Sequence, residues 1–242
     1  MPDLVIPLVV TATALVAGTI AAVAGFGGAA IMTPVLVWAF GVRDAIPLLT
    51  VAQLVGNGSR VWFNRRELDW RVVSWFALGA VPLAALGGVI FAAAPAPILR
   101  RLLGLFLILS VVYRHTALGK RQRVGLRGFA WVGAVFGFLS ALLGSVGPLQ
   151  APFFLAYGLV KGAYIGTEAL STVIMHVVKI GVYSGYSLLS LETIYLGLAI
   201  GSVLIVGSYL GKRILQRVPE NAFPIVIEGV LVIAGGQFLI LG

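Results

Sequence analysis

Two glycine clusters interrupt the apolar runs of this chain, and each occupies the same place in its half of the sequence. The first is residues 24–28, followed by Pro34, and the second is residues 143–147, followed by Pro152. Glycines and a proline break a helix, and inside a bilayer a non-helical backbone persists only where it is buried in protein or lines a cavity. The repeat therefore predicts two broken membrane segments that contribute to one binding site.

The composition decides the solvent in which these segments fold. Hydrophobic residues make up 60% of the chain, charged residues only 10%, and the mean hydropathy is +1.06. Such a chain lacks the polar coat of a soluble domain. Runs long enough to cross about 30 Å of hydrocarbon as helices recur, without the alternating period of outer-membrane strands. We therefore expect an all-α polytopic membrane protein.

The charged residues, the two histidines and the absence of cysteine argue against several classes of partner. The net charge is +9, but the basic residues lie in short loops without an aromatic-interleaved face, so we expect no nucleic acid partner. The chain has no cysteine and two histidines without a carboxylate cluster beside them, so we expect no metal and no cofactor. The N-terminus has no positive region of a signal peptide, so we expect the first helix to be retained.

A polar, basic stretch at residues 114–127 divides the chain into an N-terminal transmembrane repeat, residues 1–113, and a C-terminal transmembrane repeat, residues 128–242. We expect apolar helical segments at residues 4–24, 31–40, 46–63, 72–92, 98–113, 128–143, 149–159, 163–183, 193–210 and 222–241. The second of each set of five is too short to span comfortably, about ten to fourteen residues or roughly 15–21 Å at 1.5 Å per residue. The break before it should therefore lie inside the bilayer.

The basic loops indicate how often each half crosses the membrane. If each broken segment is a helical hairpin, most lysines and arginines fall on one side and only Arg43, Arg100 and Arg101 oppose them. Four passes per half would move the basic residues of 212–217 to the outside, so lysines and arginines would be divided less clearly between the two sides of the membrane. We predict five passes per half, each half a glycine-broken hairpin plus three spans, and the two halves inverted. Both termini would be outside and the central basic loop cytoplasmic.

The glycine breaks favour an anion site. A helix starting at Gly28 or Gly147 presents free backbone N–H groups and its positive dipole end to the membrane interior. The alternative for a single cluster is that its glycines only permit close helix packing. Two clusters at matched positions favour two helix ends facing one substrate, as in secondary transporters.

These features resemble the TauE/SafE sulfite exporter family, also called the toluene sulfonate uptake permease family. The resemblance rests on the two glycine clusters with Pro34 and Pro152, the tandem halves and the basic central loop, and it covers essentially the whole chain. The family's glycine run is usually denser, whereas Ala29 ends the first copy and Val146 interrupts the second. The resemblance implies a transporter, not an enzyme, that moves sulfite, sulfonates or sulfoacetate-like anions across a prokaryotic plasma membrane.

Polar residues inside the expected spans are the next candidates, because each is costly in hydrocarbon and usually faces the protein interior. A shift of 119 residues superposes Asn57 on His176 and Arg60 on Lys179. Each pair is spaced i, i+3 and shares a helix face. We expect the four side chains to form a two-sided clamp for a sulfur oxyanion. The alternative is that the two cations extend to opposite interfaces as topology anchors.

The expected site also includes glycines of the breaks and nearby polar side chains. These further candidates for substrate binding are Gly25, Gly27, Gly28, Thr33, Gln53, Gly144, Ser145, Gly147 and Gln150. Glu168, His176 and Glu228 are candidates for proton coupling, since histidine titrates near neutrality. For His176, a purely structural hydrogen bond is the alternative.

Two other functions remain open at this point. Ser145 and His176 would supply the dyad of an intramembrane serine hydrolase. The repeat mate of Ser145 is Phe26, however, and a dyad does not need a repeated site. A passive anion channel would use the same helix ends and basic residues, and the sequence does not separate it from a carrier. For a carrier, we expect one repeat to move against the other around the site.

Overall fold

The computed structural model describes residues 2–115, 124–144 and 146–214. Throughout these ranges the regular structure is helical, and no strand occurs in them. The helices are α1 (Pro2–Ala24), α2 (Gly28–Phe63), α3 (Trp70–Ala93), α4 (Ala96–His115), η1 (Leu126–Gly128), α6 (Phe129–Leu143), α7 (Gly147–Ala156), α8 (Lys161–Gly185) and α9 (Leu191–Ile214). Within the described residues, six helical segments are long and apolar enough to cross a membrane, in α1, α2, α3, η1 with α6, α8 and α9. The prediction of an all-α chain with repeated membrane-length helices is confirmed.

Both predicted breaks are present, and their backbones match. Gly25 follows the end of α1 with φ of 80°, and Gly144 follows the end of α6 with φ of 79°. These two positions superpose under the shift of 119 residues, and each N–H donates to the carbonyl four residues earlier at 2.9 Å. Because a positive φ is strained for residues with a Cβ, glycine ends each helix in this way. The sequence repeat is therefore a repeat of backbone geometry.

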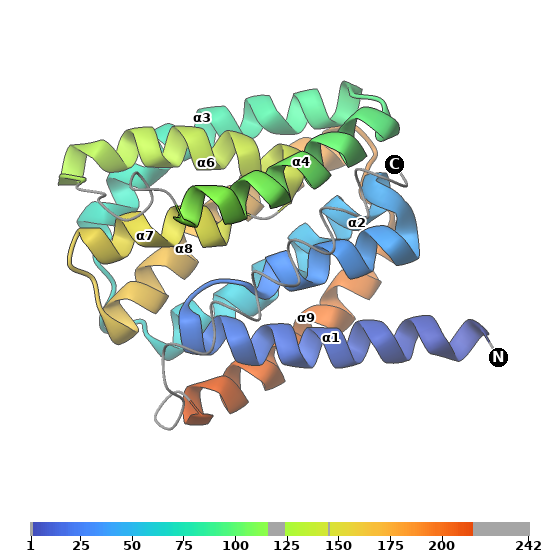
Figure 1. The fold of residues 1–242 in the computed structure, drawn as a ribbon, viewed down its shortest axis with the longest axis horizontal. Helices are drawn as coiled ribbons and strands as arrows, with labels where there is room; N and C mark the ends of the chain where they lie inside the picture. The colour runs from blue at the N-terminus through green and yellow to red at the C-terminus, as the bar shows by residue number, and fades with distance from the viewer. Residues whose placement is uncertain (1, 116–123, 145, 215–242) are drawn as a thin grey trace.

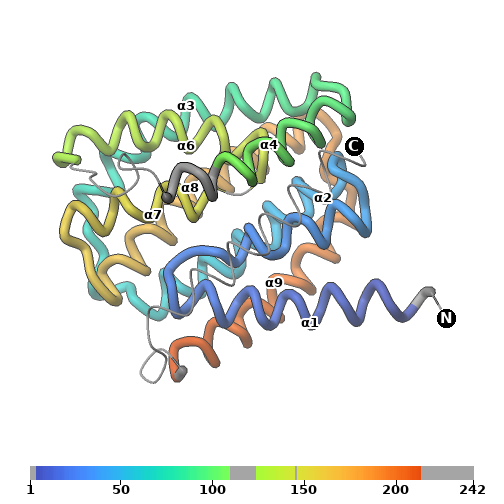
Figure 2. The backbone as a smooth tube through the Cα atoms, in the orientation of Figure 1, coloured from blue at the N-terminus to red at the C-terminus, as the bar shows by residue number. Residues whose placement is uncertain are grey.

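The connection between the short return helix and the following long helix differs between the two halves. Residues 31–40 and 46–63, expected as separate helices, form the single element α2, in which Gly41 alone is non-helical, with φ of 74° and ψ of 161°. Figure 2 shows the tube of α2 running to one end of the molecule and folding back there. In the second half, α7 ends at Ala156 and α8 begins at Lys161. The expected short return and long span are thus present in both halves, joined by one glycine in the first and by a short turn in the second.

The closest helix pairs join the two halves of the sequence. Helix α3 packs along α6, and α1 packs along α9. A Cβ at Gly79 of α3 would overlap the carbonyl oxygen of Ala130, and one at Gly207 of α9 would lie 2.6 Å from the carbonyl oxygen of Leu15. Small residues let membrane helices approach to this distance. The two halves are therefore interleaved rather than set side by side.

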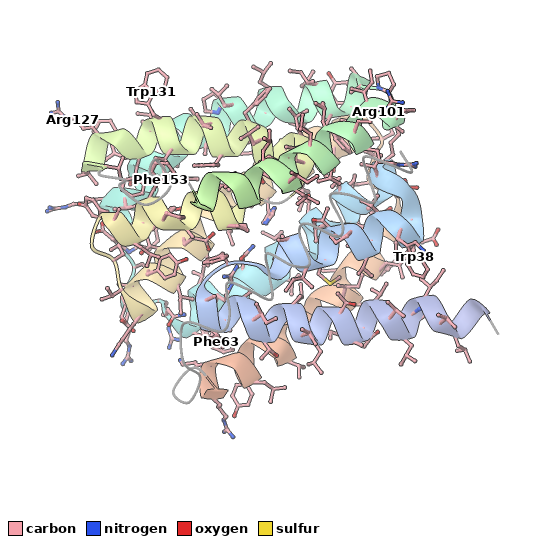
Figure 3. The ribbon with its side chains drawn as sticks, in the orientation of Figure 1. Trp38, Phe63, Arg101, Arg127, Trp131 and Phe153 are labelled. Atoms are coloured by element: carbon pink, nitrogen blue, oxygen red, sulfur yellow. The ribbon has the colours of Figure 1, made fainter. Side chains whose placement is uncertain are left out.

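Corresponding helices run in opposite directions in Figure 1. Helix α1 runs from right to left, whereas its counterpart α6 runs from left to right; α3 runs from left to right, whereas its counterpart α9 runs from right to left. Long apolar side chains cover the outside of this bundle. Trp131 and Trp38 extend from it in Figure 3 and are 78% and 54% exposed. The polar side chains described below are buried instead, which is the distribution that a lipid environment favours.

Candidate functional site

The two broken segments meet at a small buried cavity. Its volume is about 30 Å³, room for two or three water molecules at about 10–15 Å³ each. Residues of both breaks and of α2, α6, α7 and α8 line it: Phe26, Gly27, Gly28, Ala29, Gln53, Asn57, Arg60, Ser140, Gly144, Val146, Gly147, Gln150, Glu168, Thr172 and His176. Polar side chains from both halves of the chain thus face one enclosed space.

The helix ends at the cavity differ in the donors that they present. A Cβ at Gly147 would lie 3.2 Å from the Cβ of Phe26 and 3.8 Å from the backbone nitrogen of Gly27, so the tips are in contact. The first N–H groups of α2 have no intrahelical acceptor, as at any helix start. In α7, Pro148 has no N–H, and the N–H of Leu149 donates to the carbonyl of Val146 at 3.0 Å. The end of α2 is therefore the better anion donor.

Equivalent residues of the two halves touch at the cavity wall. Nδ2 of Asn57 lies 3.2 Å from Nε2 of His176, and the two positions are 119 residues apart. Both side chains are buried. Because Asn57 and His176 superpose under the shift that relates the glycine breaks, their contact places the cavity where the two halves meet.

Arg60 connects the first break to the cavity. Its guanidinium donates to the carbonyl of Gly25 at 2.6 Å and to that of Ala21 at 3.2 Å, and it also donates to the side-chain oxygen of Asn57. Nη1 lies 3.8 Å from Oε2 of Glu168. A guanidinium at the C-terminal end of α1 satisfies the carbonyl of Gly25, adds a second donor to that of Ala21 and offsets the negative end of the helix dipole.

Lys179 plays the equivalent part at the second break but stays behind the cavity wall. Its Nζ donates to the carbonyl of Ser140 at 3.3 Å and to the hydroxyl of Ser140 at 3.1 Å. Ser140 is the counterpart of Ala21 under the shift. Lys179 is 0% exposed and Arg60 6% exposed, so both cations are held inside the protein rather than extended to an interface. Only Arg60 of the two lines the cavity.

Glu168 gives the second half a charge that the first half lacks. Its Oε1 accepts hydrogen bonds from Nε2 of Gln150 at 2.7 Å and from the hydroxyl of Thr172 at 3.3 Å. Under the shift, Glu168 falls on Leu49 and Gln150 falls on Ile31. The site is therefore asymmetric, with one carboxyl facing the guanidinium of the other half.

Four buried polar atoms at this cavity have no hydrogen-bond partner among the described residues. They are Nε2 of Gln53, Oε1 of Gln150, Oε2 of Glu168 and Nδ1 of His176. Burying such an atom unsatisfied costs about 1–3 kcal/mol, so unpartnered atoms are rare away from ligands and bound water. Their gathering around one cavity indicates a place that is completed by a small polar ligand.

The structure brings most of the expected site residues together. Those that line the cavity are Gly27, Gly28, Gln53, Asn57, Arg60, Gly144, Gly147, Gln150 and His176, with Glu168 from the proton-coupling set. Gly25, Thr33 and Lys179 do not line it; Gly25 binds Arg60 through its carbonyl, and the hydroxyl of Thr33 donates to the carbonyl of Ala29 at 2.6 Å. Ser145 and Glu228 lie outside the described residues.

Two polar lining residues, Thr172 and Ser140, were in neither the expected substrate-binding set nor the proton-coupling set. Thr172 is the counterpart of Gln53 under the shift, so the repeat itself contained the signal for it. Ser140 is the counterpart of Ala21, which has no polar side chain, and nothing in the sequence distinguished it from other serines in apolar helices. Its role at the wall comes from its contact with Lys179.

Comparison with known protein families assigns the chain to one of them. The family described as sulfite exporter TauE/SafE matches residues 10–238, which include both breaks and every cavity-lining residue. Searches of curated proteins and of solved structures each returned no significant match. With its membrane-length helices and a family match over nearly its whole length, the chain belongs to the sulfite exporter TauE/SafE family and is a multi-pass membrane protein.

Proposed function

We propose that this protein is a secondary transporter of small sulfur oxyanions, and that the anion binds in the cavity between the two broken segments. The observation that carries the proposal is the cluster of unpartnered buried polar atoms beside a free helix N-terminus and Arg60. Amide and backbone N–H groups with a guanidinium are the donors that oxyanions accept from. Membership of the family supports a sulfur anion as the cargo.

The size of the cavity narrows the choice among sulfur anions. A volume of about 30 Å³ favours a compact oxyanion such as sulfite over a long or aromatic sulfonate. Sulfoacetate and other small sulfonates require the tips to separate further. We therefore place sulfite first among the candidate substrates.

The charges at the two ends of the bundle support the inverted topology and an orientation in a prokaryotic plasma membrane. Arg127 and Arg101 lie at opposite ends in Figure 3. Arg71 lines the same surface pocket as Leu126, and Lys212 donates to the carbonyl of Phe63 at 3.3 Å, so both lie at the end of Arg127. Arg43 donates to the carbonyl of Ala94 at 2.6 Å, at the other end. The more basic end would face the cytoplasm.

Helix packing suggests which parts move during alternating access. Helix α2 packs on α9, where a Cβ at Gly197 would lie 2.6 Å from the Cβ of Val51. Helix α8 packs on α3 and α6; the rings of Phe91 and Tyr183 are 5.3 Å apart, and the hydroxyl of Tyr183 donates to the carbonyl of Ala141 at 2.6 Å. We propose that α1, α2 and α9 form one body and α3, α6, α7 and α8 the other.

This division differs from the motion expected from the sequence, in which one repeat moves against the other. Each proposed body contains helices of both repeats. Between the bodies, α2 faces α8 through the contact of Asn57 with His176 and the ion pair of Arg60 with Glu168, and Gly166 of α8 packs against Asn64 at the end of α2. The polar contacts around the cavity separate readily because water can replace them.

The first experiment is thermal stabilisation of the purified protein in detergent by sulfite, sulfoacetate, taurine, isethionate, sulfate, acetate and chloride. A ligand that binds only the folded protein stabilises it by about 2.7 kcal/mol at 100 times its Kd. We expect sulfite to raise the unfolding temperature and Arg60→Met to abolish the rise. Stabilisation by no sulfur anion would overturn the proposal. In proteoliposomes, saturable flux supports a carrier, and ohmic current supports a channel.

A further inference from the structure

Glu168 lines the cavity, and its ion pair with Arg60 leaves one carboxylate oxygen without a hydrogen bond. Oε2 of Glu168 lies 3.8 Å from Nη1 of Arg60 and has no hydrogen-bond partner among the described residues. That distance permits charge attraction but is too long for a hydrogen bond. Oε1 accepts from Gln150 and Thr172 instead. The carboxyl is thus held through Oε1, while Oε2 is free to bind a proton.

An oxyanion in this cavity would compete with Glu168 for Arg60. Both would carry negative charge in a buried space, where like charges a few ångströms apart repel strongly. No other cation lines the cavity in the part of the chain that the structure describes. One guanidinium would therefore face two anions unless one of them were neutralised.

We infer that Glu168 binds a proton when the anion binds, so that the transporter carries one proton with each anion. The proton adds to Oε2, and Oε1 continues to accept from Gln150 and Thr172. The new O–H group becomes a donor to an oxygen of the substrate, and Arg60 is released to pair with the anion. This inference rests on the proposed function, and it adds a second transported species to it.

The titratable groups near Glu168 come from α2 and α8. Among the described residues, Arg60 of α2 and Tyr164, one turn earlier on α8, interact with it electrostatically. The hydroxyl of Tyr164 donates to the carbonyl of Ala24 at 3.2 Å. Farther along α8, His176 also lines the cavity, with Nε2 against Asn57 and Nδ1 unpartnered among the described residues, and Lys179 is bound by Ser140.

The number of protons carried with each anion follows from the presence of a carboxyl in only one half of the cavity. Glu168 is the one acidic side chain among the described residues that line the cavity, and its counterpart in the first half is Leu49. A single carboxyl takes up a single proton. Transport of a singly charged anion would then be electroneutral, whatever the direction of transport.

The test is an infrared difference spectrum of the membrane-reconstituted wild-type protein with and without sulfite, recorded together with the heat of sulfite binding. We expect sulfite to produce the carbonyl band of a newly protonated carboxylic acid. The band should be absent in Glu168→Gln and present in Glu192→Gln, which replaces an exposed acid at the start of α9. If Glu168→Gln does not insert, absence of the band from the wild-type spectrum would still overturn the inference.

Affinity gives a second readout. Glutamine mimics the neutral acid, so Glu168→Gln should bind sulfite without the wild-type requirement for a proton. The ratio of the wild-type Kd to that of Glu168→Gln should rise about tenfold per pH unit on the alkaline side, because only the wild type must take up a proton to bind. The titration of sulfite itself affects both proteins equally and cancels in the ratio. Sulfite binding without a new carboxylic acid band, or with a constant ratio, would overturn the inference and leave the proposed function intact. Absence of sulfite binding by the wild-type protein would remove both.

Discussion

The two broken segments have the same backbone but different chemistry. Each begins with a glycine at φ of about 80°, bonded to the carbonyl four residues earlier. The first break continues into α2 with free N–H groups, whereas the second continues into α7 with Pro148 and an internal bond from Leu149. The repeat therefore gives the two breaks the same backbone, but the first break offers more N–H donors to an anion than the second.

The cations of the two halves show the same division. Arg60 binds two carbonyls of its own break and Asn57, yet still lines the cavity beside Glu168. Lys179 makes both of its hydrogen bonds to Ser140 and does not reach the cavity. A planar guanidinium with five donors can hold several partners at once, whereas an ammonium is a compact charge with three. We therefore assign Arg60 to the substrate and Lys179 to the support of the break.

The largest expected effect comes from filling the helix ends. Gly28→Leu and Gly147→Leu should each abolish sulfite uptake, because a leucine side chain would displace groups that line the cavity. A Cβ at Gly147 would lie 3.2 Å from the Cβ of Phe26 in the other tip, and one at Gly28 would lie 3.0 Å from the Cβ of Ala21 and 3.5 Å from Nε2 of Gln53. Uptake into proteoliposomes measures the effect, and Gly181→Leu is the control, since a Cβ there meets nothing within 4 Å. Retained uptake in both variants would remove the proposed site.

Substitution of the two cations tests their unequal roles. Arg60→Met should weaken sulfite binding by about 30–150-fold, which corresponds to about 2–3 kcal/mol for a hydrogen bond to a charged group. Lys179→Met should change the Kd by no more than about threefold, or about 0.7 kcal/mol. Calorimetry measures both, with Lys161→Met at the end of the bundle as the control. Equal losses in the first two variants would restore the symmetric clamp expected from the sequence.

Loss of the Lys179 side chain should lower the stability of the protein more than its affinity for sulfite. Lys179→Met leaves the hydroxyl of Ser140 without its donor and the carbonyl of Ser140 with only the N–H of Gly144, and it should lower the free energy of unfolding by about 1–3 kcal/mol. Tyr183→Phe removes one bond to Ala141 and should cost about 1 kcal/mol. Thermal unfolding without ligand measures both. A Lys179→Met protein as stable as wild type would contradict a supporting role.

The smallest effect is expected at the equivalent positions Gln53 and Thr172. Gln53 has an unpartnered amide at the cavity, so Gln53→Ala should weaken sulfite binding about tenfold, or about 1.4 kcal/mol. Thr172 is already bonded to Glu168 and Gln150, so Thr172→Ala should weaken it no more than about twofold. Calorimetric Kd values check the order. The reverse order would shift the anion from α2 toward α8.

Much of the fold could be predicted because it depends on local properties of the chain. Membrane-length apolar runs predict helices wherever they occur, and glycine clusters predict where those helices break. The polar positions in the spans were candidates for the same reason, since a polar group in hydrocarbon is costly at any point along a helix. Gln53, Asn57 and His176 were found in this way, and the structure places all three at one cavity.

What the sequence by itself determined is the class of the chain, the place of its two breaks and the set of polar side chains near them. Only the tertiary structure decided that α1 packs on α9 and α3 on α6, that Glu168 faces Arg60, and that Lys179 lies behind the wall. Hydrophobicity and backbone freedom belong to a residue and its neighbours in the chain. The carboxylate partner of Arg60 comes from a segment more than a hundred residues away, and the shift that made Arg60 and Lys179 equivalent carried no information about which of them would face a carboxylate.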